Sequence, residues 1–175
     1  MVDGGEIDIP YLSDVLRCEH VELLLSTEPA SVESASAFEA RNAARPSVTG
    51  EEVLDAAVRV GRHVAVKEFS CDVLPLVQAL AQGEEPPTPS PVPTSLLFGK
   101  LPASERVQKA RVGRLTASFL ARADGVRTTR EILAEMIDPC PDRAARDATE
   151  QGCCRVLIQL LGLHFVTLEW EIDAQ

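Results

Sequence analysis

The histidines and cysteines are the side chains with which this sequence could bind a metal ion. The three histidines, His20, His63 and His164, lie far apart, and none belongs to an HExxH or HxH pair. Cys18 and His20 are two residues apart, which on a helix points them to nearly opposite faces. No two cysteines have the CxxC spacing that is typical of structural zinc sites. We therefore expect no metal centre.

The five cysteines are odd in number and scattered along the chain, at Cys18, Cys71, Cys140, Cys153 and Cys154. This pattern argues against a disulfide framework. Free cysteines usually behave as small buried apolar side chains, and we expect that role here.

Nucleotide binding and nucleophilic catalysis have no matching motif either. The glycines are isolated, and neither GxxxxGK[ST] nor GxGxxG occurs, so no loop is suited to cradling a phosphate. No GxSxG elbow occurs, and the sequence Ser70, Cys71, Asp72 is more typical of a helix start than of a nucleophile beside its base. The sequence predicts a protein that is not an enzyme, with no catalytic residues and no cofactor.

Charge is distributed unevenly along the 175 residues, whose net charge is −10. Residues 1–93 carry 16 acids and 6 bases, residues 94–130 carry 8 bases and 2 acids, and residues 131–175 carry 9 acids and 3 bases. The overall negative charge repels phosphate backbones and argues against nucleic acid as the partner. The basic block suits either an acidic peptide or partner, or neutralisation of this protein's own acidic half.

Length and hydropathy indicate an ordinary folded protein, since 45% of the residues are hydrophobic. No apolar run reaches the length of a membrane span, and the first ten residues lack the basic and then apolar pattern of a secretory signal. We expect a cytoplasmic protein without a membrane partner.

A proline-rich stretch divides the chain. Residues 84–93 (EEPPTPSPVP) contain five prolines, which forbid a helix and favour an extended linker. Residues 1–83 are then a mainly helical N-terminal docking region, with helices expected at 9–26, 50–60 and 72–80, a weakly anchored one at 31–44, and a strand at 63–69. The helix at 50–60 opens with a capping box formed by Thr49 and Glu52. Whether the two halves share one core stays open.

Residues 94–175 are expected to contain two strands, three helices and a closing strand. The strands are predicted at 95–99 and 107–112 and the first helix at 114–123. A second capping box, Thr128 with Glu131, opens a helix that Pro139 stops. Asp142 caps a third helix, which ends near Gly162, and residues 166–172 alternate as a strand with one solvent-exposed face. This order predicts an α+β, helix-rich fold with a winged helix-turn-helix-like C-terminal module; alternatives are a three-helix bundle with a β arm or one continuous α+β domain.

The segment 107–133, VQKARVGRLTASFLARADGVRTTREIL, resembles the peptide-binding winged-helix family that includes the PqqD chaperone and the recognition elements of ribosomal peptide natural product pathways. In that family a strand leads into a helix that ends in "DG", followed by a short basic stretch and a Thr-led helix. Residues 122–128 of this chain are similar. The family's usual extra strand before this segment is not obvious in the sequence.

The resemblance implies that the leader of a precursor peptide adds as a strand to a sheet edge and lies against the third helix. Here that edge is 107–112 and that helix face is 155–159. The expected peptide-binding residues are Arg106, Val107, Lys109, Arg111, Arg155 and Gln159. Lys109 and Arg111 alternate onto one strand face, where they could bind acidic side chains or simply protect an open edge from aggregation. Reversing both charges is expected to leave folding nearly intact.

The sequence thus predicts a non-catalytic accessory protein that binds a leader peptide and presents it to a partner modifying enzyme. By resemblance, such enzymes include multinuclear non-heme iron oxidases. Two alternatives stay open: a winged-helix transcription regulator, and a regulatory or structural subunit of a methyltransferase or another enzyme.

Overall fold

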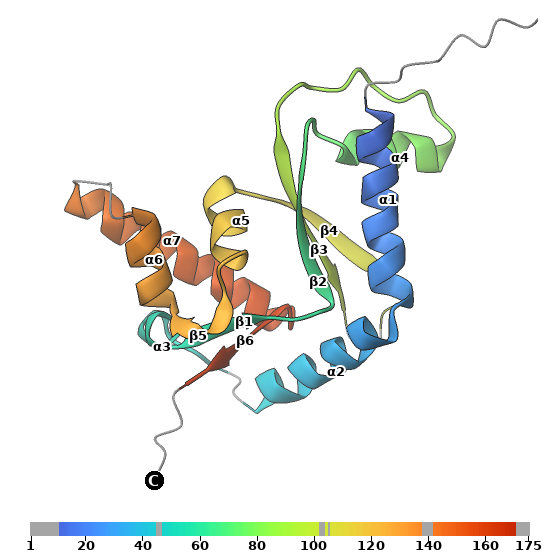
Figure 1. The fold of residues 1–175 in the computed structure, drawn as a ribbon. Helices are drawn as coiled ribbons and strands as arrows, with labels where there is room; N and C mark the ends of the chain where they lie inside the picture. The colour runs from blue at the N-terminus through green and yellow to red at the C-terminus, as the bar shows by residue number, and fades with distance from the viewer. Residues whose placement is uncertain (1–10, 45–46, 102–103, 105, 138–141, 171–175) are drawn as a thin grey trace, which may run out of the picture.

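The computed structural model describes residues 11–44, 47–101, 104, 106–137 and 142–170, which form an α+β fold of seven helices and two three-stranded antiparallel sheets (Figure 1). In chain order the elements are α1 (Leu12–Thr27), α2 (Pro29–Ala43), α3 (Gly50–Asp55), β1 (Ala57–Val60), β2 (Val64–Phe69), α4 (Leu74–Gln82), β3 (Thr94–Lys100), β4 (Val107–Val112), α5 (Arg114–Leu120), β5 (Asp124–Thr128), α6 (Thr129–Ile137), α7 (Arg143–Gly162) and β6 (Val166–Glu169). The predicted α+β, helix-rich class is confirmed.

The first sheet has the strand order β2-β3-β4 and stands between α1 on one side and α5 with α7 on the other (Figure 1). Its central strand β3 sends alternate side chains to the two sides. Leu96 and Phe98 pack with Val15 and Cys18 of α1, whereas Leu97 joins the cluster around α5, α6 and α7. Both faces of this small sheet are therefore covered.

The second sheet has the order β5-β1-β6, with both neighbours antiparallel to β1. Here the prediction of one helix over 50–60 is wrong, because α3 ends at Asp55. Ala56 has the extended angles φ −94° and ψ 149°, and the next four residues form the middle strand. Apolar residues at 53, 54, 57 and 58 suit a helix, but two distant strands pair with the second half of that stretch.

The two halves of the chain share both sheets, which the sequence left open. β1 lies between β5 and β6, and β2 pairs with β3, so each sheet joins strands from before and after the proline-rich stretch. Each apolar cluster also contains residues from both halves, such as Val53 with Leu157 and Phe69 with Phe98. Residues 84–93 hold neither helix nor strand and connect α4 to β3.

Several local predictions are confirmed. Thr49 and Glu52 form a complete capping box, and Thr128 and Glu131 exchange the equivalent hydrogen bonds at the start of α6. The Asp142 side chain accepts from the Ala144 amide and caps α7, and Gly83 ends α4 at φ +70°. Pro139, predicted to stop the helix before α7, lies outside the described residues.

One residue of the predicted solvent-exposed face of the last strand is instead buried. Thr167 retains only 3% of its exposure because the end of α2 lies against β6, where the Asn42 side chain donates to the carbonyls of Leu161 and Val166. Residues 171–172 of the predicted strand lie outside the described residues. Within the described ranges, none of the helices combines the length and apolarity needed to cross a bilayer.

Candidate functional site

Strand β4 forms an edge of its sheet, because it pairs with β3 alone among the described strands. Its side chains alternate: Val107 packs into the cluster under α1, and Lys109 and Arg111 share that face, while Ala110 and Val112 face the other way. The Lys100 amide donates to the His63 carbonyl, on the side of β3 that faces β2. Along β3 the backbone groups of successive residues therefore point alternately toward β2 and toward β4. The backbone groups of Lys109 and Arg111 therefore point outward, away from β3.

A groove of about 270 Å³ runs beside this edge, between β4 and α7. Its apolar lining comes from Leu97, Val112, Val156, Leu160 and Phe165, and its polar lining includes Gln108 and Gln159. An extended chain laid along the outer edge of β4 would meet unpaired backbone groups on one side and apolar surface on the other.

The structure brings only some of the predicted peptide-binding residues to this groove. Arg111 and Gln159 line it. Arg106 and Arg155 are exposed but are not part of its lining, and Val107 is buried under α1. Lys109 forms an ion pair with Glu22 of α1 on the opposite face of the sheet.

Half of the eight bases of the basic block, Lys109, Arg111, Arg127 and Arg130, pair with acids of this same chain. Arg111 binds the Asp72 carboxylate through Nε and Nη2, at 3.1 Å and 2.7 Å, and these hydrogen bonds raise the pKa of its guanidinium. Arg130 pairs with Glu51 and Asp55, and Arg127 pairs with Asp124 and Glu135. Much of the block therefore neutralises the protein's own carboxylates, which was one of the two interpretations of the charge pattern.

The Asp124–Gly125 pair, predicted to form a "DG" turn, has a specific geometry in this chain. Asp124 accepts hydrogen bonds from the amides of Val126 and Arg127 and from the Arg127 side chain, and this lowers its pKa to about 2. Gly125 has φ +77°, and a Cβ there would lie 2.8 Å from Nε of Arg59. These residues belong to β5, a strand that the sequence interpretation treated as a helix-breaking turn.

His63 is fully buried in the turn before β2. Its ring lies edge-on to Phe38, 5.2 Å between centroids, and makes a similar contact with Phe165. Nδ1 lies 3.0 Å from the Ser34 hydroxyl and Nε2 lies 2.8 Å from the His164 carbonyl oxygen. Burial lowers the pKa of this imidazole. The arrangement is that of a satisfied neutral core histidine.

His164 ends α7 in a left-handed conformation with φ +60°. Its amide bonds to the Leu161 carbonyl and the Phe165 amide bonds to the Leu160 carbonyl, which is the Schellman pattern. The predicted end of this helix near Gly162 is confirmed, since Gly162 is its last helical residue, and His164 takes the left-handed position two residues later. His164 thus lies in the turn between α7 and β6.

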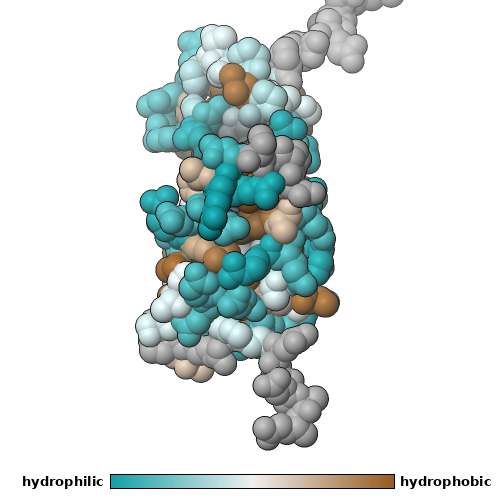
Figure 2. All heavy atoms as spheres, turned by 90° about the vertical axis from the view of Figure 1, so that its left-hand side faces the viewer, coloured by the Kyte–Doolittle hydropathy of each residue, from teal (hydrophilic) through white to brown (hydrophobic). Residues whose placement is uncertain are grey.

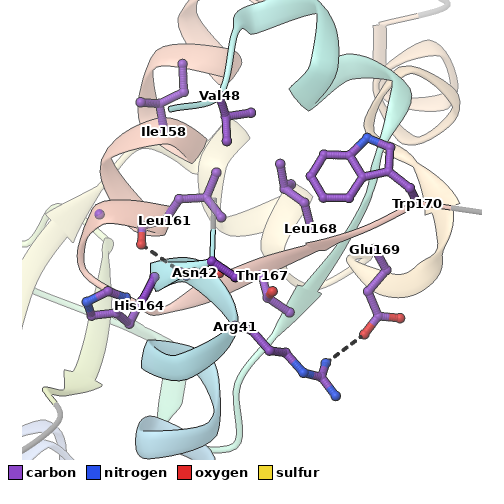
Figure 3. Close-up of a pocket in the computed structure, with 13 residues that line it drawn as sticks. Arg41, Asn42, Val48, Ile158, Leu161, His164, Thr167, Leu168, Glu169 and Trp170 are labelled. Atoms are coloured by element: carbon purple, nitrogen blue, oxygen red, sulfur yellow. Dashed lines mark hydrogen bonds and ion pairs between the residues drawn. The ribbon is translucent and has the colours of Figure 1, made fainter. Parts of the chain in front are cut away.

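A larger cavity of about 920 Å³ lies between the end of α2, the end of α7 and β6 (Figure 3). Val48, Ile158, Leu161 and Leu168 contribute apolar walls, and Arg41, Asn42, Thr167, His164 and Glu169 contribute polar groups. Trp170 also lines it while packing against the main core cluster. Sequence reasoning missed this cavity, since Arg41 and Glu169 are joined only by tertiary structure.

Nδ1 of His164 is buried and has no hydrogen-bond partner among the described residues. An unsatisfied buried polar atom typically costs about 1–3 kcal/mol, so this atom is unusual in a folded protein.

The described residues hold no group of three metal-ligating side chains. Cys18, Cys71, Cys153 and Cys154 are buried free thiols, and Cys140 lies outside the described residues. Burial raises the pKa of Cys18 to about 11 and that of Cys153 to about 12, so both thiols are protonated at neutral pH.

Seen from the side of α6 and α7, the surface is mainly hydrophilic with isolated hydrophobic residues (Figure 2).

No family model, curated protein or solved structure matches the chain.

Proposed function

We propose that this protein is a non-catalytic accessory protein that captures a leader peptide of a ribosomal peptide precursor and presents it to a modifying enzyme. The observation that carries the proposal is the open edge of β4 lying beside an apolar groove against α7. A peptide that adds to a sheet edge gains main-chain hydrogen bonds, and pockets for alternate side chains give it specificity.

The order of elements also supports the resemblance to peptide-binding winged-helix modules. The sheet β2-β3-β4 is followed by three helices, α5, α6 and α7, with the short strand β5 inserted. We assign β2, which comes from the first half of the chain and pairs with β3, as the extra strand that was not obvious in the sequence before 107–112. In this proposal the winged-helix module begins at β2.

The groove suggests what kind of peptide fits. Its apolar lining suits an extended segment with alternate apolar side chains, because every second side chain would point toward Val156 and Leu160. Arg114, exposed at the start of α5, has no acidic partner among the described residues and is free to attract a carboxylate of the peptide.

The proposed enzyme-docking role belongs to α1. Leu12, Leu16, Leu23 and Leu24 are exposed on the side of α1 that faces away from the sheet, and Glu19 lies among them. A helix with apolar side chains on both sides commonly has a second packing partner, and the acidic first half favours a basic one.

The test is selection of a random peptide library against the purified chain, followed by affinity measurements on matched variants. Arg111→Ala and Arg111→Pro both remove the ion pair with Asp72, but only the proline variant removes the outward amide of the β4 edge. We expect selected peptides to bind the alanine variant and to lose at least tenfold in affinity for the proline variant, with circular dichroism confirming that both fold. Equal affinity for the two variants would exclude strand addition at β4. Salt-sensitive duplex DNA binding without peptide affinity would favour the regulator alternative.

A further inference from the structure

The cavity between α2, α7 and β6 has the composition of a small-molecule site. Its volume of about 920 Å³ lies within the range of protein pockets for small ligands. In the view of Figure 3 the apolar side chains of Val48, Ile158 and Leu168 lie toward one side, while Arg41 and His164 lie toward the other. We propose that it binds a small amphipathic carboxylic acid, with Arg41 holding the carboxylate and the apolar walls holding the body of the ligand.

Among the described residues, the charge at the polar side of the cavity is incompletely balanced. Arg59 binds Glu169 through two contacts, Nε to Oε1 at 2.6 Å and Nη2 to Oε2 at 2.9 Å. Arg41 contacts the same carboxylate only at 3.3 Å, through a single nitrogen. Two guanidinium groups thus share one carboxylate, and Arg41 is the weakly held one. An arriving carboxylate can accept two hydrogen bonds from that guanidinium.

The apolar walls account for the rest of the ligand. Ile158 keeps 40% of its exposure beside the cavity, although the neighbouring Leu157 and Leu160 of α7 are buried. Covering Ile158, Leu161 and Trp170 with a hydrocarbon body would remove apolar surface from water. His164 also lines the cavity, and its Nδ1 has no hydrogen-bond partner within the described structure.

This site is distinct from the proposed peptide groove. The cavity contacts α7 through Ile158 and Leu161, whereas the groove contacts it through Val156, Gln159 and Leu160. Ligand binding in the cavity is therefore independent of peptide binding in the groove.

Trp170 is the only tryptophan of the chain and lines the cavity, so its fluorescence reports directly on occupancy. The probes are 6-phenylhexanoate and its neutral amide, 6-phenylhexanamide, titrated separately into the full-length protein. We expect a saturable fluorescence change with both probes and at least tenfold tighter binding of the acid. Equal binding of acid and amide, or no saturable change with the acid, would overturn the proposal.

Two variants separate the parts of the site. Arg41→Gln is expected to weaken the acid at least tenfold and to leave the amide unchanged, whereas Ile158→Ser is expected to weaken both. The matched control is Arg122→Gln, since Arg122 is exposed in the turn after α5 and donates to the Ser118 carbonyl. Loss of acid binding in the control, or undiminished acid binding in Arg41→Gln, would show that Arg41 does not hold the carboxylate.

Discussion

Nε2 of His63 donates a hydrogen bond to the backbone carbonyl oxygen of His164 over 2.8 Å. Because a carbonyl only accepts, the proton of the neutral imidazole lies on Nε2, and Nδ1 accepts from the Ser34 hydroxyl over 3.0 Å. The Ser34 oxygen in turn accepts from the Arg62 amide. One buried ring thereby connects α2, the turn before β2 and the turn before β6.

Because His63 is buried in its neutral form, we expect the protein to become less stable in mild acid. Burial lowers the folded-state pKa of His63 below its ordinary value of 6.5, so below that pH the unfolded chain binds a proton more readily than the folded one. The stabilising effect is complete above pH 6.5 and is lost as the pH falls toward the folded-state pKa. We expect the free energy of unfolding to decrease by up to about 1.4 kcal/mol per pH unit in that window from this group.

The measurement is urea unfolding at intervals from pH 7.5 to pH 5, compared with His63→Gln. The variant removes this titration, so its unfolding free energy should depend less steeply on pH, although it is lower at pH 7.5. Identical slopes for the two proteins would show that His63 is not held neutral.

The left-handed conformation of His164 predicts a difference between two substitutions. His164→Gly and His164→Ala both remove the ring, but only alanine retains the steric cost of φ +60°. The glycine variant should be the more stable by about 1 kcal/mol. Thermal or urea unfolding of the pair measures this directly, and an alanine variant as stable as the glycine variant would mean that the helix end relaxes out of this conformation.

Gly99 of β3 is required for the packing of Phe165. A Cβ at this position would lie 2.2 Å from Cζ of the Phe165 ring. Since that ring is itself buried, Gly99→Ala should lower the free energy of unfolding by about 2 kcal/mol. The control is Gly152→Ala inside α7, where an added Cβ meets nothing within 4 Å and should stabilise the helix by about 0.5–1 kcal/mol. Similar effects of both substitutions would contradict close packing at Gly99.

What the sequence predicts well is local. The capping boxes at Thr49 and Thr128 need only a hydroxyl and a carboxylate three residues apart, and both are present. The strands β2, β3 and β4 have β-branched and aromatic content within a few residues of the predicted bounds.

What it does not predict depends on distant partners. β1 is a strand because Ala57 and Arg59 pair with β5 and β6, which lie more than sixty residues away. Likewise, Thr167 is buried because α2, whose composition is only weakly apolar, lies against β6. The cavity lining needs α2, α7 and β6 together, so no short motif marks it. At the candidate groove, the sequence predicts the strand β4 and the helix α7. The sheet register decides which face of β4 carries Lys109, and that face points away from α7.

The last prediction concerns Lys109 and Glu22, which form an ion pair between β4 and α1. Both side chains are partly buried, with 21% and 32% of their area exposed, so water screens them less than a surface pair. The expectation that Lys109 could be reversed without consequence for folding is therefore revised. Lys109→Glu should place two carboxylates together and destabilise the protein, and adding Glu22→Lys should restore the opposite charges and most of the stability.

A double-mutant cycle with Lys109→Met and Glu22→Gln measures the coupling, which we expect to be about 1 kcal/mol at low salt and smaller in 1 M salt. Coupling near zero would leave Lys109 available for an external carboxylate, in which case its loss should weaken peptide binding without affecting stability. With the expected coupling, Lys109 instead fixes α1 against the sheet, and the proposed peptide site depends on the backbone edge of β4 and on the α7 side of the groove.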